Sequence, residues 1–143
     1  MGLSMKAYAF ALAAVVLTAV PASASTILAK VDLSDQQMTV YVDGWQRYAW
    51  PVSTARRGYV TPVGEYHAQR LAAMWYSRKY DNSPMPHSIF FMGGYAIHGT
   101  EYVKRLGTPA SHGCVRLHPD NAATLFDLVR ANGTENMDIQ IEE

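Results

Sequence analysis

The sequence predicts a mainly β domain that carries one helix near its C-terminal end. Residues 27–33, 37–42 and 45–52 are short runs rich in strand-forming side chains, and Asp43-Gly44 between the last two runs is a strong signal for a tight hairpin turn. Residues 137–141 alternate apolar and polar side chains, as a half-buried strand does. Residues 119–132 have the apolar spacing of a helix.

The first 24 residues predict a secretory signal peptide, which leaves residues 25–143 as one domain. Lys6 precedes an apolar run over residues 7–20, and the small residues Ala22 and Ala24 occupy the two positions that a signal peptidase inspects. The apolar run has 14 residues, fewer than the ~20 that a membrane-spanning helix needs. We therefore expect export, cleavage and no stable membrane insertion afterwards; an uncleaved anchor is the alternative.

The charge balance does not favour electrostatic binding to nucleic acid or to an anionic membrane. After cleavage the chain keeps 11 basic and 12 acidic residues, a formal charge of −1. Its one cysteine, Cys114, cannot form an internal disulfide. An unpaired thiol in an exported protein indicates a function, since it is exposed to oxidation; a small buried structural residue is the alternative.

The middle of the chain predicts further strands separated by loops. Residues 61–64 are loop residues before a candidate strand at 65–71, and residues 89–92 and 95–97 form a buried pair of strands around Gly93-Gly94. Residues 72–88 mix aromatic and basic side chains with Pro84 and Pro86. This mixture predicts a long irregular excursion over the surface, of the kind that often carries function.

The helix is bounded by clear signals at both ends. Pro119 suits the first helical turn, and the carboxylate of Asp120 suits the positive end of the helix dipole. Leu125, Phe126 and Val129 form the apolar stripe, and Asn132-Gly133 ends the helix.

Two histidines near Cys114 predict nucleophilic chemistry. A cysteine attacks as its thiolate, and a free thiol has a pKa of about 8.5, so a neighbouring imidazole that accepts the proton would make it reactive and lower that pKa. His112 lies two residues before Cys114, and His98 follows an apolar strand 16 residues upstream. Gly113 permits a tight turn whose backbone N–H groups serve as donors to an oxyanion.

Metal binding is the competing interpretation of the same residues. Cys114, His98, His112 and His118 offer four ligand atoms, but their spacing fits no usual zinc pattern and the chain has no second thiol. We therefore expect no metal and no cofactor.

The two segments resemble the signature of the L,D-transpeptidase catalytic-domain (YkuD-like) family. The resemblance rests on His98-Gly99-Thr100, a spacer, and Ser111-His112-Gly113-Cys114, with support from the Thr61–Tyr66 turn and from Leu106–Pro109 before the cysteine loop. It runs from about residue 26 to residue 141. It implies a β-sandwich with one short α-helix after the cysteine loop.

The resemblance also implies an activity, acyl transfer on peptidoglycan stem peptides in the periplasm. Cys114 would form a thioester with a tetrapeptide stem, release D-alanine and pass the acyl group to an amine of another stem or of an envelope protein. His98 would be the proton donor and acceptor, His112 a support of the cysteine loop, and Gly113 the source of an oxyanion N–H.

Other residues receive less specific roles. Some family members have Ser where this chain has Gly99, so we expect the orienting hydrogen bond on His98 to come from the Gly99 backbone carbonyl. Arg116 either binds a substrate carboxylate or braces the loop, which Ser111 also shapes. Trp75 and Tyr76 either cover the stem peptide or pack.

The same residues fit two other functions. Water in place of the amine would make the protein an L,D-carboxypeptidase or a hydrolase of peptidoglycan crosslinks. A peptidoglycan-binding module without turnover is the third hypothesis, although binding does not require an unpaired cysteine beside two histidines.

Overall fold

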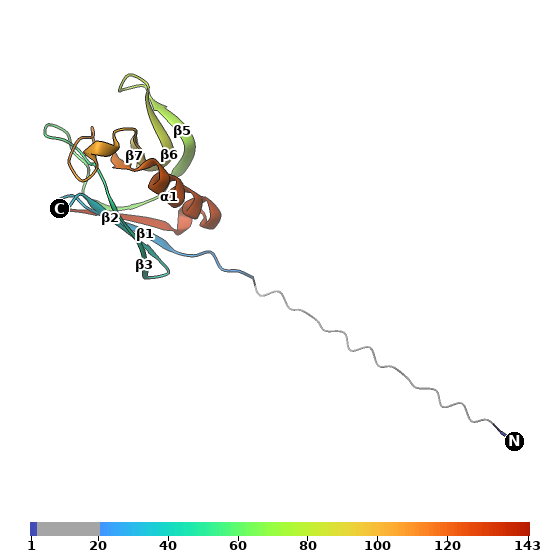
Figure 1. Ribbon diagram of the computed structural model, residues 1–143. Helices are drawn as coiled ribbons and strands as arrows, with labels where there is room; N and C mark the ends of the chain where they lie inside the picture. The colour runs from blue at the N-terminus through green and yellow to red at the C-terminus, as the bar shows by residue number, and fades with distance from the viewer. Residues whose placement is uncertain (3–20) are drawn as a thin grey trace.

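The computed structural model describes residues 1–2 and 21–143 and shows two β-sheets with one α-helix (Figure 1). The mainly β sandwich predicted from the sequence is therefore confirmed. The apolar run of the predicted signal peptide, residues 7–20, lies outside the described residues. Within the described part of the chain, no helix is both long and apolar enough to cross a membrane.

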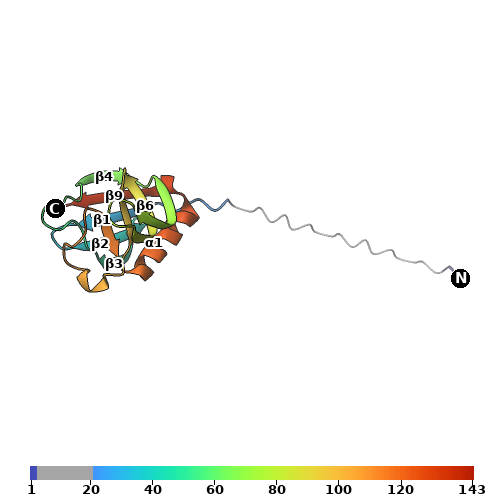
Figure 2. The same ribbon diagram turned by 90° about the horizontal axis from the view of Figure 1, so that it is seen from above.

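The first sheet has five strands in the order β3-β2-β1-β9-β4, which Figure 2 shows side by side. The strands are β1 (Ile27–Asp32), β2 (Gln37–Val42), β3 (Trp45–Pro51), β4 (Gly64–His67) and β9 (Met137–Glu142). β1 pairs antiparallel with β2 and parallel with β9, so the two ends of the domain lie together in the middle of the sheet. Asp43 and Gly44 have φ of 50° and 80°, the left-handed conformation that the predicted tight turn needs.

The second sheet has four strands in the order β5-β6-β7-β8. They are β5 (Arg70–Ser77), β6 (Ser83–Met92), β7 (Tyr95–Gly99) and β8 (Val115–Leu117). The helix α1 (Pro119–Asn132) packs on β6 and β7, and two short 3-10 turns, η1 (Val103–Arg105) and η2 (Thr134–Asn136), complete the fold. The helix begins and ends where its capping residues predict, with Gly133 at φ 92° after its last residue.

The core lies between the first sheet and the layer made by α1 and the second sheet. Alternate residues of β1, β2 and β9 point into it and are almost fully buried. The apolar stripe of α1 faces the same core through Ala122, Leu125, Phe126 and Val129. This alternation stabilises the scaffold that carries the second sheet.

Two predictions about the middle of the chain are wrong. Residues 72–88 are not an irregular excursion but most of the β5–β6 hairpin, whose pairing continues through both prolines. Pro84 and Pro86 are two residues apart, so their nitrogens face the same edge of β6. β7 pairs with β6 only from Ile89 onward, so that edge is free there and no ladder hydrogen bond is lost.

The second wrong prediction concerns the candidate strand at residues 65–71, which belongs to two sheets. The N–H of Ala68 donates to Met137 in the first sheet, and the N–H of Gln69 donates to Phe90 in the second sheet. The chain therefore changes sheets between these two residues, which separate the end of β4 at His67 from the start of β5 at Arg70. The strand pattern alone does not mark such a crossing, because side-chain alternation is compatible with both sheets.

Candidate active site

The cysteine loop, residues 111–114, is held in shape by the Ser111 side chain. The Ser111 hydroxyl donates to the Cys114 carbonyl at 2.6 Å and accepts from the Gly113 N–H at 3.0 Å. Ser111 is fully buried, so these two bonds are made in a low-dielectric setting where losing one is costly. The loop leads directly into β8, which places Cys114 immediately before a paired strand.

Gly113 is required by both its backbone conformation and its surroundings. Its φ is 135°, a region that side chains with a Cβ rarely adopt. A Cβ at this position would lie 2.7 Å from the Tyr95 ring and 2.8 Å from the Val60 carbonyl oxygen. The Gly113 carbonyl accepts from the Thr61 hydroxyl at 2.8 Å, and that hydroxyl accepts from the Ala55 N–H at 2.9 Å. Thr61, which sequence analysis placed in a simple loop, thus ties the 61–64 turn to the cysteine loop.

The Gly113 N–H has a partner inside the loop, which changes the expected oxyanion donor. Because this N–H donates to the Ser111 hydroxyl, it is not directed at a substrate carbonyl in this structure. The sequence-based assignment of Gly113 as the oxyanion donor therefore does not match the loop geometry. The glycine acts here through its conformation and its lack of a side chain.

Cys114 is half-buried and lines the cavity of the second sheet. Its Sγ lies 3.8 Å from the Gly94 carbonyl oxygen. Burial raises the pKa of the thiol above its ordinary value, and the Ala96 backbone hydrogen bond and the Arg116 charge act in the opposite direction with smaller effect. This burial opposes the lowered pKa expected from the sequence, and it favours a neutral thiol in the free protein.

His98 lies on β7 and is brought to Cys114 by strand register. β7 and β8 are parallel, with Ile97 opposite Val115 and His98 opposite Arg116. Cys114 is two residues before Arg116, so its side chain projects from the same face of the sheet as those of Arg116 and His98. Both Cys114 and His98 line the same cavity.

The environment of His98 keeps its imidazole neutral and sets its tautomer. The side chain is almost fully buried, and this burial lowers its pKa to about 4, against the opposing effect of the Gly99 hydrogen bond. Nδ1 lies 2.7 Å from the Gly99 carbonyl oxygen, so Nδ1 carries the proton and donates to it. Nε2 is then an unprotonated acceptor, as a general base requires.

The space around Gly99 explains why a side chain is absent there. A Cβ would lie 3.2 Å from Cγ of Pro86 and 3.3 Å from Cα of Pro119, between β6 and the start of α1. A serine at this position would push against both prolines. The backbone carbonyl of Gly99 orients the imidazole without needing that space.

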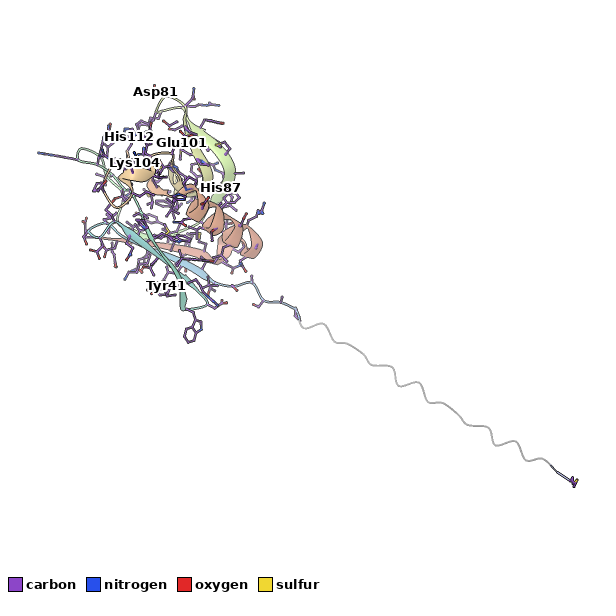
Figure 3. All side chains as sticks on the ribbon, viewed as in Figure 1. Tyr41, Asp81, His87, Glu101, Lys104 and His112 are labelled. Atoms are coloured by element: carbon purple, nitrogen blue, oxygen red, sulfur yellow. The ribbon has the colours of Figure 1, made fainter. Side chains whose placement is uncertain are left out.

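His112 lies between two tyrosines that the sequence analysis did not select. Its ring stacks on Tyr80 with centroids 4.0 Å apart and planes at 14°, and Tyr59 meets it edge-on at 4.7 Å. Tyr80 lies in the tip of the β5–β6 hairpin, so the stack joins the hairpin to the cysteine loop. Burial and the charges of Arg56, Arg116 and Lys79 lower the pKa of His112. Figure 3 shows His112 at the same end of the molecule as Asp81 in the hairpin tip.

The cavity beside Cys114 has a volume of about 900 Å³, enough for a peptide segment. Trp75 lines it and packs edge-on against Phe90 at 5.6 Å, whereas Tyr76 is exposed and does not line it. Arg116 also lines the cavity, with Nη1 3.4 Å from the Ala110 carbonyl oxygen, a weak brace. No group of three or more His, Cys, Asp or Glu side chains converges as a metal site in residues 1–2 and 21–143.

Comparison with known proteins identifies one family. Residues 27–139 match the family model described as the L,D-transpeptidase catalytic domain (YkuD). Among curated proteins, none matches the chain in sequence.

Solved structures share the fold at low sequence identity. An L,D-transpeptidase from Mycobacterium smegmatis superposes with a TM-score of 0.75 at 23% identity, covering 83% of this chain and 59% of its own. An L,D-transpeptidase from Stackebrandtia nassauensis gives a TM-score of 0.72 at 26% identity, covering 82% of this chain and 56% of that structure. L,D-transpeptidase 3 from Mycobacterium tuberculosis, in complex with a faropenem-derived adduct, gives a TM-score of 0.71 at 18% identity. The match covers 83% of this chain and 61% of that structure. The chain thus spans about three fifths of these structures.

Proposed function

The chain belongs to the L,D-transpeptidase catalytic-domain family, and on this premise we propose that it is a peptidoglycan L,D-transpeptidase that works through a thioester on Cys114. The substrate would be a tetrapeptide stem, and the acyl group would pass from its third residue to an amine. Membership of the family supports this activity. The roles of the individual residues are part of this proposal.

One observation carries the proposal, the convergence of a half-buried thiol and a buried neutral imidazole on one cavity. Parallel pairing of β7 with β8 places His98 and Cys114 on the same sheet face. The Gly99 carbonyl holds the imidazole with Nε2 free to accept a proton. A binding module has no use for this arrangement, whereas a cysteine acyltransferase needs both groups.

The first half-reaction begins from the neutral pair that burial favours. Sγ of Cys114 attacks the carbonyl carbon of the third stem residue while its proton passes to Nε2 of His98. The tetrahedral intermediate then collapses: the bond to the D-alanine nitrogen breaks, and the His98 imidazolium gives its proton to that leaving amine. A thioester and free D-alanine result, and His98 returns to its neutral form.

The N–H of Cys114 itself is the donor we assign to the oxyanion. The Gly113 N–H is directed at Ser111, whereas the next N–H of the same turn belongs to the residue whose sulfur attacks. Ser111 and Thr61 hold the two carbonyls of the turn, which fixes the direction of its remaining N–H groups. A preorganised donor of this kind contributes about 3 kcal/mol to transition-state stabilisation in acyl transfer.

The second half-reaction transfers the acyl group to an acceptor. An amine attacks the thioester carbonyl, His98 takes the amine proton, and the thiolate that leaves recovers a proton from the imidazolium. Water in the place of the amine gives a shortened stem and a carboxypeptidase. The acceptor amine would come from a neighbouring stem peptide or from a lysine of an envelope protein.

A product-mass experiment tests the proposal. The protein, residues 25–143, is incubated with disaccharide-tetrapeptides, and the masses of the products are measured by mass spectrometry. Crosslinked dimers that have lost one D-alanine are expected from transpeptidation. Shortened monomers alone would assign the hydrolytic activity instead, and a bound but unchanged substrate would assign the binding module.

We also propose that the protein acts in the periplasm after removal of residues 1–24. The proposal rests on the charged start, the apolar run and the small residues before Ser25. N-terminal sequencing of the protein recovered from the periplasmic fraction of an expressing cell is the test. A start at Ser25 is expected, and an intact Met1 in the membrane fraction would support an uncleaved anchor.

A further inference from the structure

Charge is divided unevenly between the two halves of the molecule. Residues 54–116, which supply the second sheet and the cavity, contain eight Lys and Arg against three Asp and Glu. Residues 21–53 and 117–143, which supply most of the first sheet and α1, contain three against nine. A near-neutral total therefore conceals a cationic catalytic half and an anionic scaffold half.

Among the charged residues that line the cavity, cations predominate. Four basic side chains line it against one carboxylate, that of Glu101; the basic residues are Arg70, Arg78, Lys79 and Arg116. Within the described chain, none of these four forms a salt bridge. Two basic residues elsewhere do: Lys30 lies 2.9 Å from Glu142 and Arg130 lies 3.0 Å from Asp127, both in the scaffold half. The positive charge at the cavity is therefore left for a ligand.

Aromatic rings hold three of these cations in place without neutralising them. The guanidinium of Arg70 lies 3.7 Å from the Phe90 ring centroid and 4.8 Å from that of Trp75. The ammonium of Lys79 lies 5.4 Å from the Tyr80 ring, and the guanidinium of Arg116 lies 5.8 Å from the Tyr102 ring. A ring face orients a cation while leaving its N–H donors at the edge free for hydrogen bonding.

Arg70 is the most tightly positioned of the set, because two rings contact its one guanidinium. It begins β5 and pairs with Phe90 of β6, so the sheet register sets its place at the cavity wall. A guanidinium with free edge donors matches a carboxylate in two parallel hydrogen bonds. The hairpin tip adds Arg78 and Lys79 to the same lining.

We propose that Arg70, together with Arg78 and Lys79, binds free carboxylates of the stem peptide, so that the protein selects acidic stems over stems whose side carboxyl groups are amidated. This proposal rests on the proposed function and names a specificity within it. Amidation removes the charge and one acceptor oxygen while preserving the size of the group. The cationic side chains that line the cavity would then be desolvated without gaining a charged hydrogen bond to a carboxylate in return.

The test compares two tetrapeptide stems that differ only in amidation of their side carboxyl groups, with the terminal D-alanine unchanged. We expect wild-type kcat/KM for D-alanine release to be about tenfold higher or more for the free-carboxylate stem. Raising salt from about 0.05 M to about 0.5 M should narrow the difference, since the interaction is between charges at an open cavity. Equal rates on the two stems, or a preference for the amidated stem, would overturn the inference.

Variants separate carboxylate binding from a structural role. Arg70→Gln should reduce the preference to about threefold or less by slowing only the free-carboxylate stem, and Arg70→Lys should keep part of it. Arg130→Gln, on α1 and outside the cavity, should leave the preference unchanged. If Arg70→Gln slows both stems equally, the residue only packs. Should that variant unfold, the double change Arg78→Gln and Lys79→Gln in the hairpin tip gives the same comparison.

A binding measurement keeps this inference distinct from the proposed function. Calorimetric titration of Cys114→Ala with each stem reports recognition without turnover, and the free-carboxylate stem should bind about tenfold more tightly. If the wild type releases no D-alanine from either stem but this difference in binding remains, the proposed function fails and the inference stands. If turnover occurs and the two stems bind equally, the inference fails alone.

Discussion

The first sheet and the second sheet differ in the regularity of their burial pattern and of their backbone. In β1, β2 and β9 buried residues alternate with more exposed ones, and the buried side chains are apolar. The second sheet carries two prolines in β6, a positive φ of 53° at His87 and a buried histidine on β7, and Gly113 before β8 has a φ of 135° that strains any other residue. The difference indicates that the first sheet supplies stability, while the second sheet departs from regular packing around the cavity that Cys114 and His98 line.

The two halves also differ in how their polar groups are satisfied. Charged residues of the first sheet form exposed pairs such as Lys30 with Glu142. Around the cavity, buried Ser111 and Thr61 instead make specific hydrogen bonds to the backbone of the cysteine loop. Exposed ion pairs contribute little, whereas a buried polar group that loses its partner is costly. Changes to the two halves should therefore affect stability and activity to different extents.

The largest expected effect is the loss of activity in Cys114→Ala. Turnover should fall by about 10⁴-fold or more, as removal of a nucleophile does, while the melting temperature stays close to that of the wild type. Product formed by folded Cys114→Ala would remove this residue as the nucleophile.

The matching change in the scaffold half is Ile139→Ala. Ile139 lies on β9 in the core with 1% of its surface exposed, so its truncation should lower the free energy of unfolding by about 2–5 kcal/mol. Chemical denaturation measures this loss. At a temperature where the variant remains folded, kcat should stay within about twofold of wild type. A large fall in kcat at full folding would show that the two halves are coupled.

Acid should destabilise the protein through His98. The pKa of this buried imidazole is about 4 in the folded chain, against about 6.5 when exposed, so between these values the unfolded chain binds the proton more readily. Stability from this source is complete above pH 6.5 and falls by about 3 kcal/mol as the pH drops to 4. Denaturant midpoints at several pH values should show the fall in wild type and much less of it in His98→Gln. An equal fall in both would assign acid sensitivity elsewhere.

Gly113→Ala tests whether the cysteine loop tolerates regular residues. The added Cβ would meet the Tyr95 ring and the Val60 carbonyl at a φ of 135°, which should cost about 1–3 kcal/mol of stability and also slow acylation. Gly94→Ala is the matched control for stability, since no atom lies within 4 Å of its Cβ position. Thermal unfolding of the two variants gives the comparison. Equal stability would mean that the loop relaxes freely.

The smallest effect is expected from the aromatic contact between the hairpin and the cysteine loop. Tyr80→Ala removes the stack on His112 and should slow acylation by about three- to tenfold, because a pair of stacked rings contributes about 1 kcal/mol. Tyr80→Phe keeps the ring and should retain most of the rate. Single-turnover acylation is the measurement. If both variants match the wild type, His112 is supported by the loop alone.

Local sequence signals accounted for much of the fold and for the choice of Cys114 as the candidate nucleophile. Alternation in β1, β2 and β9, the Asp43-Gly44 turn and the ends of α1 were predictable because each depends on residues within a few positions of one another. The single cysteine and its histidine neighbours were recognisable in the same way. The β5–β6 hairpin was not, because Pro84 and Pro86 are tolerated only on an edge that the strand order leaves free.

What the sequence by itself determined is which groups are present: one thiol, an imidazole 16 residues before it, and a glycine at the turn. Tertiary structure decided how they act. The register of β7 against β8 placed His98 with Cys114, burial set the neutral state of both groups, and Ser111 took the N–H expected to serve the oxyanion. These outcomes depend on contacts between residues distant in the chain, and such contacts set dielectric, direction and partner in ways that local propensity does not specify.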